Sequence, residues 1–303
     1  MTLHPELERR FRTRISPFVR RHIESLDADA ATALLSQFEP DERELLDVPD
    51  FNDDPLHEDD ADIHPFPDVV HKYRSKILYL TTDECPVYCR YCTRKRKTLL
   101  SEGHAHSSPA EIAAYIAARP EIQEVIFSGG DPLMLTPTDL ADRARVFLSL
   151  PNIRFLRFHT RAFTTAPGLV SEKLLGVLSA LQAQFTGKFF AFVLHVNTAA
   201  EVSAEAAAKI QAVRRLGIPL YARTVLLREV NDTAAKLAAL CTALIAAGVQ
   251  PYYLHQLDRV TGSAHFEVKE AEAKAIYAEL RLRVPPYMLP RFVRDSKQGK
   301  YPV

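Results

Sequence analysis

Three cysteines within eight residues constrain this chain more than any other feature. Cys85, Cys89 and Cys92 follow the spacing Cys-x3-Cys-x2-Cys and come directly after the apolar run 77–80. Such a run predicts a buried strand, so we expect the thiols on the loop that leaves its C-terminal end. Three thiolates on one loop can bind three irons of a four-iron cluster and leave the fourth iron open to another ligand.

A zinc site is the alternative explanation of the same cysteines. Structural zinc has four protein ligands, and His104 or His106 could complete a Cys3His set. Disulfides cannot account for the cluster, because three neighbouring thiols cannot all pair with one another. The fourth cysteine, Cys241, lies in an Ala/Leu-rich helical pattern and is expected in the core. So few cysteines, three of them clustered, indicate a reducing compartment, and we expect the cytoplasm.

The composition excludes several classes of partner. The chain has 303 residues, 47% of them hydrophobic and 25% charged, with a formal net charge of zero. A neutral chain offers no global field for nucleic acid or a membrane surface, and no apolar stretch reaches membrane-spanning length. We therefore expect no nucleic-acid or membrane partner. The Arg-rich N-terminus lacks an apolar core and does not read as a signal peptide.

From residue 75 onward, short apolar runs alternate with helical patterns. This alternation predicts parallel strands joined by crossover helices, and six such units predict an α/β fold, a partial (β/α)6 barrel. Functional residues of such barrels lie at the C-terminal ends of the strands. Strands are predicted at 76–80, 124–127, 153–158, 189–195, 219–226 and 251–257, and helices at 109–118, 138–148, 171–184, 200–216, 233–247 and 269–282.

The first 70 residues are predicted to form an N-terminal helical extension that precedes the barrel at 71–303. Helices are expected at 7–21 and 30–38. Residues 41–62 contain eleven Asp or Glu against one Arg. A run of this kind is typical of a solvated, partly extended connector, and we expect most of it to be exposed.

The residues around the cysteines resemble a known family. The stretch 85–96, Cys-Pro-Val-Tyr-Cys-Arg-Tyr-Cys-Thr-Arg-Lys-Arg, is similar to the lysine 2,3-aminomutases, which are radical S-adenosylmethionine (SAM) enzymes that also use pyridoxal phosphate (PLP). Asp-Pro-Leu-His-Glu at 54–58 and Lys-Tyr-Pro-Val at 300–303 extend the resemblance over most of the chain. It implies a cytoplasmic isomerase with a [4Fe-4S] cluster, SAM and PLP that moves the α-amino group of L-lysine to the β-carbon. The branch associated with elongation factor P is a close variant.

The resemblance and the strand ends also suggest cofactor contacts. After the second strand, Gly129 and Gly130 would let the backbone approach a ligand, although Gly-Gly-Asp also occurs in plain turns. By alternation Gln256 and Asp258 share a face, which we assign to the barrel mouth. The cysteines would bind the cluster, and the other expected cofactor contacts are Lys300 as the PLP lysine, Lys72 and Lys76 for its phosphate, and Ser128, Gly129, Gly130, Asp131, Arg161, His195 and Gln256, with His159 less favoured.

Three residues are expected to bind the substrate. A planar guanidinium suits the α-carboxylate, and the resemblance gives this role to Arg94, although a base in the run 94–97 could simply be exposed. Asp258 and Asp295 match the aspartates that pair the ε-ammonium of lysine, which would be costly to bury unpaired. The family further implies an electron donor such as flavodoxin or ferredoxin, and a homo-oligomer.

The chain departs from the family pattern at several positions. Ala222-Arg223 stands where most relatives have Asn-Gln, and 162–165 replaces a Pro-rich phrase. The interval between Asp295 and Lys300 is shorter than usual, and the C-terminal extension with a cysteine cluster found in some relatives is not expected here. Two alternatives therefore stay open, a radical SAM enzyme for another amino acid or without PLP, and a non-enzymatic zinc-binding protein.

Overall fold

The computed structural model describes residues 6–7, 11–98 and 106–303 and contains one nine-stranded sheet whose strand order follows the chain. The strands from β2 to β8 run parallel, while β1 and β9 are antiparallel at the two edges. The strands are β1 Val69–Tyr73, β2 Lys76–Leu80, β3 Glu124–Ser128, β4 Phe155–Thr160, β5 Phe189–His195, β6 Leu220–Val225, β7 Gln250–His255, β8 Arg291–Ser296 and β9 Gly299–Pro302.

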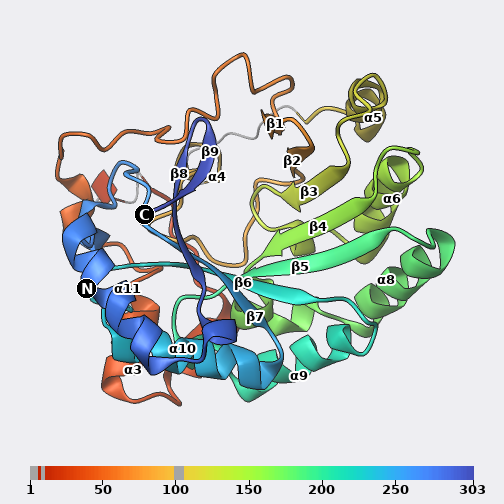
Figure 1. Cartoon of the computed structure of the whole chain (residues 1–303). Coiled ribbons are helices and arrows are strands. Elements are labelled where there is room, and N and C mark those ends of the chain that lie inside the picture. Colours follow the sequence, from red (N-terminus) through yellow and green to blue (C-terminus); the bar gives the residue numbers. More distant parts are fainter. Residues whose placement is uncertain (1–5, 8–10, 99–105) are drawn as a thin grey trace.

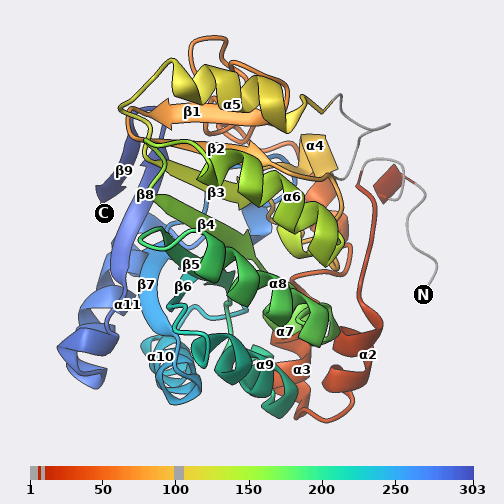
Figure 2. The same cartoon turned by 90° about the vertical axis from the view of Figure 1, so that its right-hand side faces the viewer.

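Helices cover the outer face of this curved sheet (Figures 1 and 2). Most begin at a side-chain cap, as Ser108 does for α5 and Ser171 for α8. The six predicted strand–helix units are all present, so the partial (β/α)6 barrel is confirmed. The α-helices are α2 Pro17–Ile23, α3 Ala28–Leu35, α4 Lys95–Thr98, α5 Pro109–Ala117, α6 Pro137–Leu148, α7 Ala162–Thr165, α8 Glu172–Gln184, α9 Ala204–Arg214, α10 Ala234–Ala247 and α11 Glu270–Arg283. No helix of the described residues is long and apolar enough to cross a membrane.

The two faces of the sheet differ in chemistry. Outward-facing residues pack against the helices, where Phe127, Phe158 and Phe192 form a ladder of aromatic contacts at 5.5 and 4.9 Å between ring centroids. Inward-facing residues alternate with them, so that Ala222 of β6 lies in the core while its neighbour Arg223 lines an internal cavity. The inner face therefore presents polar groups to the space inside the barrel.

The chain end is more regular than predicted. Residues 291–302 form a hairpin of β8 and β9, and this hairpin carries Asp295 and Lys300. Its strands were missed because the short segment 299–302 contains lysine, tyrosine and proline rather than an apolar run. The hairpin completes the sheet next to β7.

The N-terminal segment packs on the cysteine loop. Helix α2 begins only at Pro17, and Ser16 caps it in an extended conformation, so the predicted helix over 7–21 is wrong at 11–16; Leu7 is helical, and 8–10 lie outside the described residues. A proline disfavours the helical conformation of the residue before it. Helix α3 agrees with its prediction. Apolar residues of this segment surround Val87 of the cysteine loop; they are Ile15, Val19, Leu34 and Phe38.

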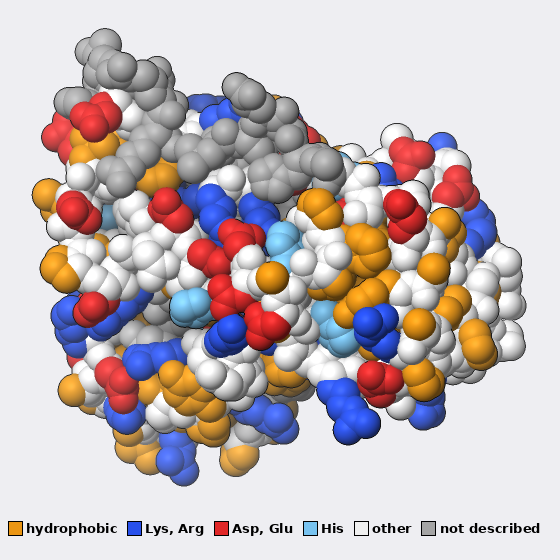
Figure 3. Space-filling model, turned by 90° about the horizontal axis from the view of Figure 1, so that it is seen from above, with side chains coloured by type: hydrophobic (Ala, Val, Ile, Leu, Met, Phe, Trp, Pro, Cys, Tyr) orange, Lys and Arg blue, Asp and Glu red, His pale blue; other side chains and the backbone are white. Residues whose placement is uncertain are grey.

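The acidic segment 41–62 is not simply a solvated connector. Glu44 is fully buried, and its two carboxylate oxygens accept hydrogen bonds of 2.7 and 2.8 Å from the guanidinium of Arg90. Glu58, also buried, pairs with Arg94 at 2.6 Å. The prediction fails at these two residues, although half of the segment is exposed, because their partners are basic residues of the cysteine loop, dozens of positions away. Acidic side chains also lie beside Lys, Arg and His side chains on the face in Figure 3.

Breaking the buried Glu44–Arg90 pair should destabilise the protein strongly. In Glu44→Gln the guanidinium of Arg90 stays buried without a counter-charge, and we expect a loss of about 3–5 kcal/mol in the free energy of unfolding. Glu279→Gln is the matched control, because its pair with Arg283 is exposed on α11 and should be worth less than about 1 kcal/mol. Denaturant unfolding of the metal-free proteins measures both, and equal losses would contradict the prediction.

Candidate active site

One cavity of about 420 Å³ lies inside the barrel. The three loop cysteines and Lys300 line the same space, although they come from opposite ends of the barrel sequence. The cavity contains most of the residues that the sequence singled out, namely Lys72, Lys76, Cys85, Cys89, Cys92, Arg94, Ser128, Gly129, Gly130, Asp131, His159, Arg161, His195, Asp258, Asp295 and Lys300. The sequence therefore predicted a set of residues that the fold gathers around one cavity.

The three cysteines of the loop could bind either a cluster or a single ion. Among the described residues, no three His, Cys, Asp or Glu side chains are grouped as a metal ion requires. A zinc ion needs all its ligands around one point, whereas each cysteine of an iron–sulfur cluster binds its own iron. His106 lies near the carboxylates of Asp68 and Asp83, at 3.5 and 3.7 Å, and His104 is outside the described residues.

The glycine turn after β3 packs on the start of the cysteine loop. The Gly130 N–H donates to the Thr82 carbonyl at 2.6 Å, and the Asp131 N–H donates to the Glu84 carbonyl at 2.7 Å. A Cβ atom at Gly129 or Gly130 would overlap these backbone atoms. The glycines are therefore required for this close approach. The turn also lines the cavity, and its contact with a cofactor stays a prediction.

Asp131 joins two strand ends. Its carboxylate accepts hydrogen bonds from the backbone N–H groups of Leu133, Arg161 and Ala162 and from the Thr160 hydroxyl, at 2.7–3.1 Å. Burial raises the pKa of Asp131, and these donors oppose the increase. Protein donors surround the carboxylate, so its evident role is to fix the loops after β3 and β4.

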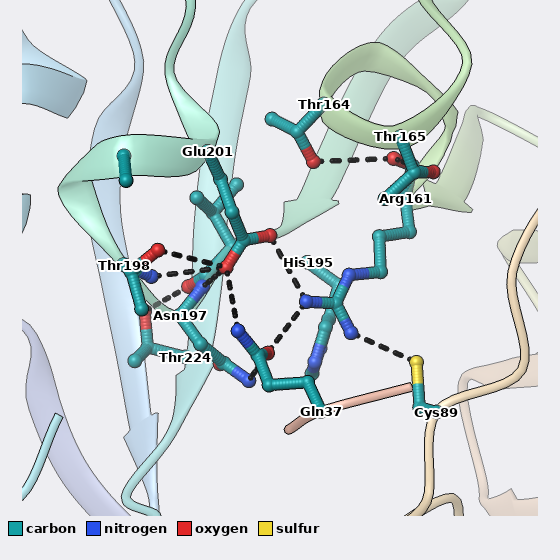
Figure 4. A network of polar contacts seen from close by, with 12 residues as sticks. Gln37, Cys89, Arg161, Thr164, Thr165, His195, Asn197, Thr198, Glu201 and Thr224 are labelled. Atoms are coloured by element: carbon teal, nitrogen blue, oxygen red, sulfur yellow. Dashed lines mark hydrogen bonds and ion pairs between the residues drawn. The ribbon is translucent and has the colours of Figure 1, made fainter. Parts of the chain in front are cut away.

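Arg161 connects the cysteine loop to a buried polar network (Figure 4). One guanidinium nitrogen donates to the Cys89 sulfur at 2.8 Å and to the Tyr91 hydroxyl at 2.6 Å. The other donates to Glu201 at 2.9 Å and to Gln37 at 2.6 Å. An ion-paired guanidinium thus contacts a thiol predicted to ligate the cluster, where hydrogen bonds to sulfur influence the cluster potential.

Gln37 is a site residue that the sequence did not reveal. It follows α3 in the N-terminal segment, is fully buried, and accepts hydrogen bonds from Arg161, Asn197 and Tyr91. The same tyrosine contacts His195 Nε2 at 2.9 Å. A glutamine in a surface-like helical pattern carries no signal of such a role. Its position shows that the N-terminal segment is part of the site.

The C-terminal hairpin forms the other end of the cavity. The Lys300 ammonium lies 2.5 Å from an Asp295 carboxylate oxygen, and His255 Nδ1 lies 3.5 Å from the same oxygen. Burial lowers the pKa of Lys300, and Asp295 opposes this decrease. Burial and Lys300 also lower the pKa of His255 to about 3, so this imidazole is neutral. The backbone N–H of Lys300 donates to the Tyr73 hydroxyl at 3.0 Å.

Two of the predicted substrate residues, Asp258 and Arg94, differ in how their charge is set by their neighbours. Burial, together with Asp295, raises the pKa of Asp258 to about 7. Arg94 is held by Glu58 through two hydrogen bonds of 2.8 and 2.6 Å. Arg94 is thus not one more exposed base of its run, and its charge is already compensated.

Gln256 is the exception among the predicted residues. Strand β7 ends at His255, so the alternation that was expected to place Gln256 beside Asp258 does not continue. Gln256 is buried, donates to the Val268 carbonyl at 2.6 Å, and does not line the cavity. The predicted facing was therefore wrong, and His255 faces the cavity instead.

Comparisons with known proteins agree with this geometry. A family profile described as the radical SAM superfamily matches residues 79–241. An L-lysine 2,3-aminomutase of Escherichia coli (strain K12) is 37% identical, over 86% of this chain and 74% of that protein. The protein of the same name from Haemophilus influenzae is 35% identical, over 83% and 72%. Among solved structures, a radical SAM methyltransferase from Sphaerobacter thermophilus aligns with a TM-score of 0.51 at 15% identity, over 77% and 72% of the two chains.

Proposed function

Since this chain belongs to the radical SAM superfamily and, within it, to the family of the L-lysine 2,3-aminomutases, we propose that it converts L-lysine to β-lysine by moving the amino group between adjacent carbons. The observation that carries the proposal is the shared cavity, which brings Cys85, Cys89 and Cys92 into the same space as Lys300. A radical migration of an amino group needs the groups expected at both ends of this cavity, the cluster and PLP. The cluster with SAM supplies the radical, and PLP supplies a π-system that can hold the migrating nitrogen.

The residues present at each end support this assignment. Three thiols on one loop suit a [4Fe-4S] cluster with one open iron for SAM. Lys300 would hold PLP, and Lys72 and Lys76 would face its phosphate. Among the described residues, neither Lys72 nor Lys76 has a hydrogen-bonded carboxylate partner. The charges of these two lysines therefore stay available for an anion.

The substrate would lie between these ends. Arg94 is proposed to face its α-carboxylate, while Asp258 and Asp295 pair the ε-ammonium. The neutral His255 and the apolar residues of the cavity wall would limit the water around them.

Further partners follow from the chemistry. Cleaving SAM consumes an electron, so a reductant is required, and we infer a flavodoxin- or ferredoxin-type donor. A reducing compartment such as the cytoplasm keeps the three thiols available for iron. A homo-oligomer is proposed on family resemblance.

Anaerobic turnover tests the proposed function directly. Reconstituted protein is incubated with SAM, PLP, dithionite and either lysine, ornithine, arginine or glutamate, and mass spectrometry follows β-amino acids and 5′-deoxyadenosine. We expect β-lysine from L-lysine. A β-amino acid from another member of the panel would overturn the substrate, and 5′-deoxyadenosine without any β-amino acid would overturn the reaction.

The raised pKa of Asp258 predicts a pH dependence of lysine binding. Below about pH 7 this carboxyl holds a proton, and an ammonium binds the ionised form better, so binding of lysine should release a proton. We expect the Kd for L-lysine to decrease as pH rises from 6 to 8. Calorimetry in buffers of different ionisation enthalpy measures both the Kd and the proton release. The Asp258→Asn variant should bind L-lysine more weakly, and its Kd should no longer depend on pH. A wild-type Kd that stays constant between pH 6 and 8 would refute the role of Asp258.

A further inference from the structure

Arg223 is a cation inside the barrel for which the described part of the chain supplies no ion-pair partner. It lies on β6, between His195 of β5 and Tyr253 of β7 in the sheet register, and lines the cavity. Its Nε atom is inaccessible to solvent and has no hydrogen-bond partner. Among the described residues, no carboxylate forms an ion pair with its guanidinium. The residue therefore carries a charge into the cavity that the protein itself does not neutralise.

Every other arginine of the cavity wall has a carboxylate. Arg94 pairs with Glu58 at 2.6 Å, Arg157 with Glu124 at 2.9 Å, and Arg161 with Glu201 at 2.9 Å. An unpaired charge that is largely shielded from solvent is costly, and Arg223 is only partly exposed, with its Nε inaccessible. The exception at Arg223 thus indicates that an anionic ligand group binds there.

The surroundings of Arg223 do not supply that anion. Burial lowers the pKa of Arg223, the positive charge of Arg94 lowers it further, and Asp295 only opposes these effects. Asp295 already has an ammonium partner in Lys300. The three imidazoles of this region have lowered pKa values, mainly through burial, and are neutral; they are His159, His195 and His255. The charge of Arg223 consequently remains uncompensated in the ligand-free chain.

The position favours a carboxylate rather than a phosphate. The lysines available for a phosphate, Lys72 and Lys76, lie on β1 and β2, whereas Arg223 lies on β6. The charged neighbours of Arg223 include Arg94, Asp295 and Lys300. A planar guanidinium matches a carboxylate through two parallel hydrogen bonds.

We propose that Arg223 binds the α-carboxylate of the amino-acid substrate, and this inference rests on the proposed function. Glu58 already neutralises Arg94, so Arg94 by itself offers little net charge for a carboxylate. Together Glu58, Arg94 and Arg223 carry one negative and two positive charges, and one carboxylate completes the balance. The carboxylate of SAM would bind the open iron and has a cation of its own. At the substrate carboxylate, Arg223 would act beside Arg94 and supply the positive charge that Glu58 takes from Arg94.

A pair of ligands that differ only in the carboxylate tests the inference. Calorimetry of the reconstituted protein measures the Kd of L-lysine and of L-lysinamide, in which a neutral amide replaces the carboxylate. In Arg223→Gln we expect the Kd of L-lysine to increase about 10- to 100-fold and that of L-lysinamide to change little. Arg223→Lys should restore part of the difference. Arg145→Gln, on the exposed surface of α6, controls for the loss of an arginine as such.

The outcomes separate this inference from the proposed function. If the wild-type protein binds a different amino acid of the panel, the proposed substrate fails, and the same comparison is made with that amino acid and its amide. Equal effects of Arg223→Gln on the acid and the amide would overturn the role of Arg223. Weaker binding of SAM alone would also overturn it, because the carboxylate would then belong to SAM. In turnover, the substitution should raise KM more than it lowers kcat.

Discussion

Replacing Cys89 by serine is expected to remove the bound iron and to abolish the cleavage of SAM. The three cysteines of the loop are the thiols that line the cavity, and a cluster held by only two thiolates lacks a ligand for one of its irons. Loss of a hydrogen-bond partner of a metal ligand typically costs about 10- to 100-fold in affinity or activity, so loss of a ligand itself should exceed about 100-fold. Iron and sulfide analysis, the absorbance of the cluster and 5′-deoxyadenosine formation measure the effect. Cys85→Ser and Cys92→Ser should behave alike.

Cys241→Ala is the control for this series. Cys241 is buried in α10 away from the main cavity, and burial raises the pKa of its thiol to about 11. The substitution removes a thiol without touching the loop, so iron content and SAM cleavage should be unchanged. Metal analysis of the same samples also reports zinc. Stoichiometric zinc in place of iron, or full iron content in Cys89→Ser, would contradict the assignment of the cluster.

Local patterns predicted the parts of the site that lie close together in the sequence. The cysteine loop follows one apolar strand and the glycine turn follows the next, and parallel strands place both ends at the same edge of the sheet. Most of the residues predicted from these strand ends do line one cavity. Gln256 is the instructive failure, because alternation holds only while the strand continues, and β7 ends one residue earlier.

The sequence could not predict the contacts that hold the cysteine loop in place. Glu44 and Arg90 are 46 positions apart, and Gln37 and Arg161 are 124 apart. Neither glutamate nor glutamine signals burial by its type, and the acidic composition of 41–62 pointed to solvent. Only the fold shows that this segment neutralises the basic residues of the loop, namely Arg90, Arg94 and Arg96.

Replacing Lys300 by alanine is expected to remove PLP binding and β-lysine formation while leaving the cluster in place. Lys300 lies on β9, the last strand of the sheet, whereas the cysteine loop follows β2, near the other edge. Both line the same cavity. Burial lowers its pKa, which increases the fraction of neutral amine that can react with an aldehyde, and Asp295 keeps the side chain directed into the cavity. Loss of a residue that reacts covalently typically costs on the order of 1,000-fold or more in turnover. Borohydride trapping followed by peptide mass spectrometry should find PLP on Lys300 in the wild-type protein and on no lysine in the variant.

Lys297→Ala provides the matched control, since it removes a lysine from the same hairpin three positions earlier. Lys297 pairs with Asp60 at 2.6 Å and with Asp62 at 3.3 Å, and it does not line the cavity. The substitution should therefore preserve trapping of PLP and β-lysine formation, and iron content should match the wild type in both variants. If Lys297→Ala abolished trapping while Lys300→Ala did not, the PLP lysine would be Lys297. The cavity that joins the cysteine loop to β9 would then lose its role in the reaction, because the two cofactors would no longer share it.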